Sequence, residues 1–203
     1  MPATDFGFTP AELHRLRLLK TPLGVQRFLD RLPYHLADTA WSPRRVLAER
    51  TAHCMEGAIF AAAALRVLGY PPLIWDLEAY RDTDHVIAIF RHRGCWGAVA
   101  KSNYANCRWR DPVYRTLREL AMSYFDTYVS VRGWRGLRTY SRPVNLKRFD
   151  HLQWMTSLKP IWFIAEHLCE IPHTRLLTRA QEKRLAPADG WLMKSVLIGH
   201  RWK

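Results

Sequence analysis

The chain has 203 residues, a length typical of one domain with a single core. Hydrophobic residues make up 48% of it, so the chain is able to bury a core and is not expected to be disordered. Its formal net charge of +13 favours anionic partners such as nucleic acid or an acidic peptide. The cations are dispersed rather than collected in one tract, however, which makes nucleic acid the less favoured partner.

Several functional classes are excluded by what the sequence lacks. No apolar run reaches the roughly 18 residues that a membrane-spanning helix needs, and the first residues do not form a secretory signal. We therefore expect no membrane association and a cytoplasmic location. No two cysteines have C-x-x-C spacing, which argues against a zinc ribbon or a dithiol redox centre. We expect no metal, no cofactor and four free thiols, at Cys54, Cys95, Cys107 and Cys169.

Three short helices are predicted in the first 50 residues. Thr9-Pro10-Ala11-Glu12 has a capping threonine, a proline at the first helical position and a glutamate three residues after the cap. Thr21-Pro22 and Ser42-Pro43 start two further helices in the same way. We expect these helices to form a cap or scaffold.

A buried helix and two paired strands are predicted next. Residues 54–68 are rich in alanine and end at Gly69, which is typical of a close-packed helix with a glycine after its last turn. Strands are predicted over residues 73–77, 85–90 and 96–101. The last two strands are joined by a hairpin turn at 91–94.

The last part of the chain is predicted less completely. Asp111-Pro112 is interpreted as the start of a helix that continues to Phe125. Residues 139–146 are predicted to be extended, and residues 161–169 and 176–184 to be helical. The tail from Trp191 to Lys203 is left unassigned. We expect a single α+β domain, with a helical part at 1–50, a core at about 50–130 and a C-terminal extension at about 131–203.

Cys54 and His85 form the pair best suited to covalent catalysis. A cysteine attacks as its thiolate, which the partial positive charge of a helix N-terminus and a nearby imidazolium stabilise. Cys54 stands where the buried helix should begin. His85 opens a strand, and a base on a rigid element is what such a nucleophile requires. We predict that His85 takes the proton of Cys54.

A third group should hold the imidazole in the correct tautomer, and it should come from the neighbouring strand. If residues 93–94 form a two-residue turn, position 85 lies opposite position 102. Ser102 then faces His85, and Asn103 does so after a one-residue bulge. We favour Asn103, whose amide oxygen accepts an N–H, with Ser102 and Asp111 as alternatives.

A cysteine helix followed by a histidine strand and a polar group on the next strand resembles the papain-like superfamily. The likeness lies in residues 85–90 (HVIAIF) and 96–103 (WGAVAKSN). The turn at 68–71 (LGYP) makes the transglutaminase-like branch the most similar, and Cys54-Met55-Glu56 is similar to the Cys-x-Glu of arylamine N-acetyltransferases. The resemblance covers about residues 50–112. Transglutaminase-like enzymes usually carry an Asp where this chain has Lys-Ser-Asn at 101–103, which leaves the third residue open.

The resemblance implies an α+β fold with a papain/transglutaminase-like core. In such a fold the nucleophile helix packs on a small antiparallel sheet, with additional N- and C-terminal helices. It also implies thiol-dependent acyl transfer, or amide or ester hydrolysis, on a peptide, amide or ester substrate, for which the net charge favours an acidic one. Two alternatives stay open: a non-enzymatic basic module that binds nucleic acid or protein, and a catalytically inactive member of the same fold.

Other polar residues around the pair are assigned to substrate binding or to structure. We assign His53, Glu56, Trp96 and Lys101 to substrate binding. Asp82 and Asp84 beside His85 would suit a metal, but no second ligand cluster accompanies them, so we do not predict a metal site. Two groups of cations and tryptophans, at 101–118 and 132–138, are interpreted as solvated basic faces.

Overall fold

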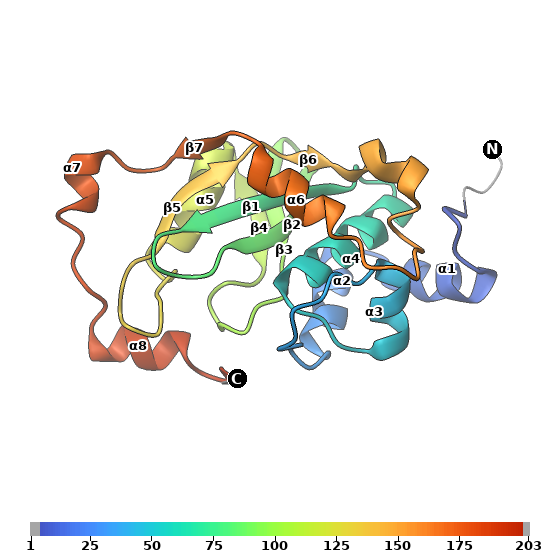
Figure 1. Ribbon diagram of the computed structural model, residues 1–203, viewed down its shortest axis with the longest axis horizontal. Helices are drawn as coiled ribbons and strands as arrows, with labels where there is room; N and C mark the ends of the chain where they lie inside the picture. The colour runs from blue at the N-terminus through green and yellow to red at the C-terminus, as the bar shows by residue number, and fades with distance from the viewer. Residues whose placement is uncertain (1–4, 201–203) are drawn as a thin grey trace.

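The computed structural model describes residues 5–200 as three layers: helices, one sheet, and a helix on its other side (Figure 1). The helices are α1 (Pro10–Arg17), α2 (Pro22–Asp30), α3 (Pro43–Glu49), α4 (Cys54–Val67), α5 (Leu117–Phe125), the 3-10 helix η1 (Leu146–Leu152), α6 (Phe163–Glu170), α7 (Arg179–Glu182) and α8 (Gly190–Val196). The strands are β1 (Leu73–Ala79), β2 (His85–His92), β3 (Cys95–Val99), β4 (Arg110–Tyr114), β5 (Leu137–Ser141), β6 (Val144–Asn145) and β7 (His173–Arg175). The predicted α+β class is confirmed.

The three N-terminal helices begin where their sequence signals predict. The Thr9 hydroxyl accepts the backbone N–H of Glu12 at 3.3 Å, and the Glu12 carboxylate accepts the N–H of Thr9 at 2.7 Å. Thr21 and Ser42 cap α2 and α3 with their hydroxyls. Each helix has proline at its start, where a missing N–H costs nothing.

One antiparallel sheet of seven strands runs through the described part of the chain, in the order β4-β3-β2-β1-β5-β7, with β6 beside β1. The turn between β2 and β3 is at Arg93 and Gly94, both with positive φ (48° and 84°). Two-residue turns of this kind match the twist of paired strands. Ala88 lies opposite Val99 and His92 opposite Cys95, which is the register that the sequence predicts.

The two faces of the sheet bury different cores. Ile74, Val86 and Phe90 face the side covered by α1–α4 and α6. Trp75 and Ile87 face the side covered by α5. Alternate residues of a strand point to opposite faces, so each central strand serves both cores and is buried on both sides. The start of β2 therefore lies deep in the molecule.

Helix α4 is buried almost all round and lies against β2. Its alanines and Gly57 allow this close approach: a Cβ on Gly57 would stand 2.3 Å from the Cβ of Lys101. Lys101 is itself buried, and its ammonium group donates to the carbonyl of Leu29 at 2.8 Å and to that of Leu32. Helix α2, the start of α4 and the segment after β3 are thus joined at one point.

The predicted helix from Asp111 to Phe125 is wrong in its first half. Residues 110–114 form β4, and α5 begins only after Thr116, whose hydroxyl accepts the N–H of Glu119 at 3.1 Å. Pro112 lacks an N–H, but β4 is the edge strand of the sheet, where proline is tolerated. Pairing with β3 therefore overrides the helix signal.

The C-terminal part differs in other ways from the predicted elements. The extended segment predicted at 139–146 is divided between β5 and β6, and η1 follows it. The helix predicted at 176–184 is reduced to α7: residues 173–175 pair with β5 as β7, the Leu176 N–H still donates to the Arg138 carbonyl, and Thr178 caps the helix only after that. Helix α8 lies within the unassigned tail, whose residues 201–203 are outside the described part. None of the helices in residues 5–200 is long and apolar enough to cross a membrane.

Candidate active site

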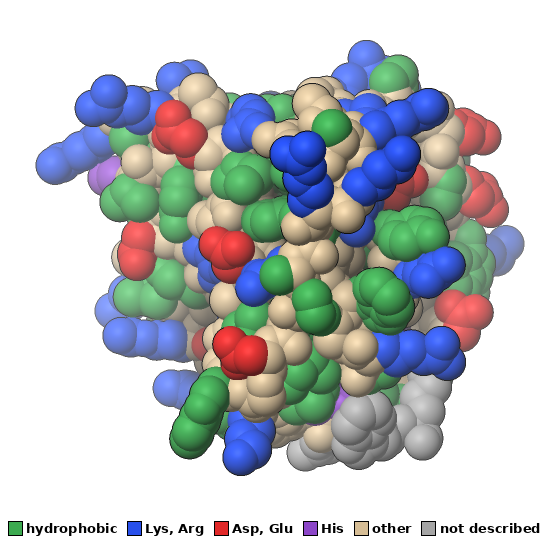
Figure 2. All heavy atoms as spheres, turned by 90° about the vertical axis from the view of Figure 1, so that its left-hand side faces the viewer, with side chains coloured by type: hydrophobic (Ala, Val, Ile, Leu, Met, Phe, Trp, Pro, Cys, Tyr) green, Lys and Arg blue, Asp and Glu red, His purple; other side chains and the backbone are tan. Residues whose placement is uncertain are grey.

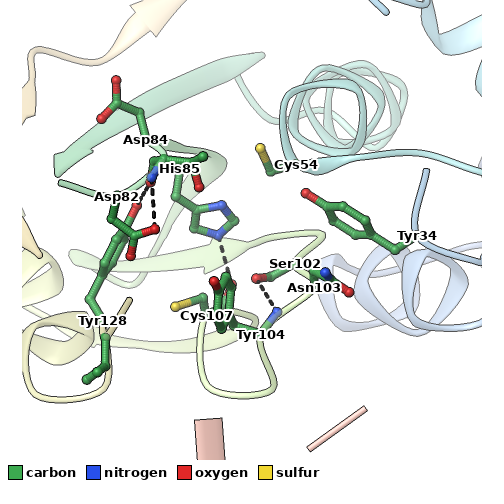
Figure 3. A pocket seen from close by; sticks show the side chains of 12 residues that line it. Tyr34, Cys54, Asp82, Asp84, His85, Ser102, Asn103, Tyr104, Cys107 and Tyr128 are labelled. Atoms are coloured by element: carbon green, nitrogen blue, oxygen red, sulfur yellow. Dashed lines mark hydrogen bonds between the residues drawn. The ribbon is translucent and has the colours of Figure 1, made fainter. Parts of the chain in front are cut away.

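Cys54 is the first residue of α4, as predicted. His53 precedes it as the N-cap residue, with extended backbone (φ −90°, ψ −173°). The first N–H groups of a helix lack partners within it, so partial positive charge collects at Cys54. The thiol is free and half-buried, and it lines a cavity of about 40 Å³ (Figure 3).

Glu56 fixes the chain that leads into α4. Its carboxylate is fully buried and accepts the Thr39 hydroxyl at 2.6 Å and the Trp41 N–H at 3.0 Å. It also accepts the His53 N–H at 3.2 Å and lies 3.2 Å from Nδ1 of His35. Glu56 does not line the cavity around Cys54. The geometry places it as a support of the start of α4, and not as part of the cavity lining.

His85 opens β2, and its side chain is 5% exposed. Its Nε2 atom lies 2.8 Å from the carbonyl oxygen of Cys107. A carbonyl only accepts hydrogen bonds, so Nε2 carries the proton and Nδ1 has the free lone pair. The imidazole lies between Cys107 and Cys54 in Figure 3, so the tautomer that can act as a base toward the cavity is the one that is held.

The orienting group is therefore a backbone carbonyl, not one of the three side chains predicted for this role. Ser102 and Asn103 line the cavity, and the Ser102 hydroxyl accepts the N–H of Tyr104 at 3.0 Å. Asp111 is exposed on β4, where its carboxylate accepts the indole N–H of Trp109 at 2.9 Å. The structure brings Ser102 and Asn103 to the site and leaves Asp111 outside it.

The loop that carries the Cys107 carbonyl is held by Arg110. The guanidinium donates to the carbonyls of Asn106, Trp109 and Ser123 at 2.9–3.0 Å. It also stacks on the Tyr124 ring, 3.9 Å from the ring centre. Several fixed donors converge on one loop, which keeps the Cys107 carbonyl in place. Arg110 was not among the predicted site residues, because its partners are backbone groups that no sequence motif marks.

Electrostatics set the resting charge of the pair. Burial raises the pKa of the Cys54 thiol, although the N–H groups of Val86 and Met55 oppose this effect. Burial also lowers the pKa of His85 to about 4. The prediction of a thiol with a lowered pKa is therefore wrong for the resting protein, because loss of hydration outweighs the helix N-terminus. At neutral pH both groups are uncharged.

Tyr34 is a site residue that the sequence does not reveal. It lines the same cavity as Cys54, and burial, together with the neighbouring Cys54 thiol, raises the pKa of its phenol. Tyr34 follows α2 in a loop, and a bridge to Ala52 brings it beside the start of α4. That bridge joins segments 18 residues apart through backbone groups, for which the sequence contains no signal. The figure shows the Tyr34 ring directed toward Cys54 (Figure 3).

The other residues assigned to substrate binding lie outside the cavity. His53 is within hydrogen-bond distance of the Thr39 carbonyl, 2.7 Å from its Nε2. Trp96 packs on the α5 side of the sheet, with Arg91 over its ring. Lys101 is buried against α2, as described above. The cavity is lined instead by Tyr104, Tyr128 and residues 82–84.

No group of three or more metal-ligating side chains comes together within residues 5–200. Asp82 and Asp84, which the sequence placed beside His85, point to different sides of it (Figure 3). What the site offers is a thiol, a neutral imidazole with a fixed tautomer, and N–H and O–H donors at a helix start. The chain matches no protein-family model and no curated protein sequence.

Proposed function

We propose that the protein is a cysteine-dependent enzyme of acyl groups, related in fold to the transglutaminase-like branch of the papain-like proteins. It would transfer an acyl group or hydrolyse an amide or ester. One observation carries this proposal: Cys54 at the first turn of α4 and His85 at the first residue of β2 line the same cavity. The cysteine helix packed on an antiparallel sheet supports the same fold relationship.

The geometry supports a general-base mechanism rather than a preformed ion pair. Nδ1 of His85 removes the Cys54 proton as the sulfur attacks the carbonyl carbon. The carbonyl π electrons move to oxygen, and the resulting oxyanion is held by the Cys54 N–H, with the Tyr34 hydroxyl, directed toward Cys54 in the same cavity, as the second donor. The tetrahedral adduct expels its amine or alkoxide, which takes the proton from His85. An acyl-enzyme remains, and water or an amine then resolves it.

A catalytically inactive protein of the same fold is the second candidate. The uncharged resting pair and the small cavity favour it, because both reduce the reactivity of the thiol. A basic binding module is less supported. Figure 2 shows Lys and Arg side chains spread over one end of the molecule with carboxylates and apolar groups among them.

The test is acylation of Cys54 by p-nitrophenyl acetate, followed by peptide mass spectrometry. We expect acetyl-Cys54 to form faster than adducts at Cys95 and Cys169, and His85→Ala to slow it by about 100-fold or more. His92→Ala is the matched control, because His92 is exposed at the far end of β2. Acetylation of Cys54 at the rate of the other thiols, and indifferent to His85, would favour the inactive protein.

A further inference from the structure

The cavity at Cys54 is too small for a substrate. Its volume of about 40 Å³ has room for water-sized groups only. An amide or ester that brings its carbonyl carbon to the Cys54 sulfur also carries groups on both sides of that carbon. One wall of the cavity must therefore move before the proposed chemistry can occur.

Most walls of this cavity are fixed by the packing of the core. Helix α4 and strand β2, which carry Cys54 and His85, are buried in the centre of the molecule. The loop at Tyr34 is joined to the start of α4 by the bridge to Ala52. The loop after β3 is held by the hydrogen bonds of Arg110. Movement of these walls would break buried contacts.

The chain after α7 reaches the edge of the same cavity. The His200 ring lies against the ring of Tyr104, which lines the cavity, with 4.7 Å between the ring centres. Gly199 lines a second hollow of about 160 Å³. The two hollows share three residues, Tyr34, Ser102 and Asn103. The end of this segment lies beside the loop that joins β3 to β4 (Figure 1). Residues 199 and 200 therefore border the region where the two hollows meet.

Residues 186–200, the strap, are attached at the periphery of the molecule. Val196 on α8 is fully buried, whereas Trp191 and Ile198 are 82% and 68% exposed. Hydrogen bonds to neighbouring loops run from the Ala188 N–H to the Gly133 carbonyl (2.9 Å), from Arg135 Nε to the Ala186 carbonyl (3.2 Å) and from the Asn106 amide to the Ser195 hydroxyl (3.2 Å). Segments with few buried apolar contacts open at a fraction of the free energy of global unfolding. The strap is therefore the wall that can move.

We propose that the strap covers Cys54 in a resting, autoinhibited form and moves away to admit substrate. The contacts that keep it closed are the burial of Val196 and the stacking of His200 on Tyr104. Only the open form accepts substrate, so the reaction rate at Cys54 scales with the population of that form. The need for opening rests on the proposed function, but access to the thiol does not depend on acyl chemistry.

Two neutral methanethiosulfonates that differ in size, the methyl and the benzyl reagent, test the proposal. In each case the thiolate attacks the sulfenyl sulfur, a mixed disulfide forms and methanesulfinate leaves, so no other oxidant is needed. Rate constants at Cys54 and at the exposed Cys169 are read by peptide mass spectrometry at pH 7. The benzyl-to-methyl rate ratio at Cys54, divided by that at Cys169, is the size ratio. It cancels the intrinsic reactivity of the reagents and any change in the thiolate fraction.

We expect a size ratio well below one in the parent protein. Val196→Asp places a charge in the buried contact of the strap and should raise the size ratio about tenfold or more. Trp191→Asp is the matched control, because it makes a similar change on the same helix at an exposed position. It should leave the size ratio within about twofold of the parent value.

His200→Ala is the second variant, used in particular if Val196→Asp unfolds the protein, which a thermal melt reveals. It removes the ring contact with Tyr104 and should raise the size ratio about threefold. If neither reagent labels Cys54 in the parent protein, labelling that appears in these variants supports the strap, and its absence there overturns it.

An unchanged size ratio in both Val196→Asp and His200→Ala would overturn the proposal, as would an equal rise in Trp191→Asp. So would a size ratio near one in the parent protein, since the benzyl group would then reach Cys54 without any opening. A rise in the variants without His85-dependent acetylation would overturn the proposed function alone. The reverse result would overturn the strap alone.

Discussion

The carbonyl oxygen of Cys107 lies 2.8 Å from Nε2 of His85, so the group that orients the candidate base belongs to the backbone. The backbone carbonyl of a residue is still present when the side chain of that residue is replaced. It is displaced instead by whatever loosens the loop that carries it. Cys107 therefore contributes its backbone carbonyl, whereas Arg110 contributes by holding the loop in place.

We predict that Cys107→Ala leaves the acetylation rate of Cys54 within about twofold of the parent, whereas Arg110→Ala lowers it about tenfold or more by releasing the loop. The ¹⁵N shifts of His85 provide a second readout: they should report protonated Nε2 in the Cys107→Ala protein and a tautomer mixture in Arg110→Ala. Equal losses in both variants would mean that the Cys107 side chain, and not its carbonyl, matters.

Tyr34→Phe tests the oxyanion contact. Tyr34 and Cys54 line the same cavity and the Tyr34 ring is directed toward Cys54, so removal of the hydroxyl should lower the rate of acyl-enzyme formation by about 100-fold. The KM for the ester should change little, because the contact strengthens as charge develops on oxygen. A faster reaction in Tyr34→Phe would show that the hydroxyl blocks the thiol instead of assisting it.

The buried His85 should make the fold sensitive to acid. Its pKa is lowered from 6.5 to about 4, so between these values the unfolded chain holds a proton that the folded chain does not. The stability that depends on a neutral His85 is therefore fully present above pH 6.5 and is lost as the pH falls through 4. The parent protein should lose about 3 kcal/mol of its free energy of unfolding between pH 7 and pH 4, measured by urea unfolding. In His85→Asn this loss should be absent. Parallel curves for both proteins would contradict the burial of a neutral imidazole.

Asp76 should act in the opposite sense. Burial, together with the charge of Asp84, raises its pKa from 3.8 to about 6, although His173 at 3.2 Å opposes the shift. The folded chain holds a proton between these values, so this contribution is present below pH 3.8 and is lost as pH rises through 6. Relative to the parent, the free energy of unfolding of Asp76→Asn should rise by about 2 kcal/mol between pH 4 and pH 7. A pH-independent difference in urea unfolding would contradict this assignment.

Glu56→Gln should destabilise the fold by about 3 kcal/mol, because an amide cannot accept from all the donors that meet the buried carboxylate. Glu49→Gln on α3 is the matched control, since Glu49 is exposed and lies 3.7 Å from Arg45. We expect Glu49→Gln to lower the free energy of unfolding by about 0.5 kcal/mol or less. A similar loss in both variants would show that the Glu56 contacts are weak.

Local signals in the sequence determined much of the fold. Thr9, Thr21 and Ser42 mark helix starts through hydrogen bonds that span three residues, and the turn at 93–94 sets the register of β2 and β3. Cys54 at a helix start and His85 at a strand start follow from the same short-range patterns. Interactions between near neighbours in the chain are visible in the order of residues, because they do not depend on the rest of the fold.

The tertiary structure alone decided what surrounds the pair. The Cys107 carbonyl, the fixing of its loop by Arg110 and the bridge that brings Tyr34 beside Ala52 all involve backbone groups, which every residue type carries. The charge state of Cys54 and His85 likewise depends on burial, which long-range packing creates. Residue identity specifies side-chain chemistry, but hydration and backbone geometry at a site arise only when distant segments pack together.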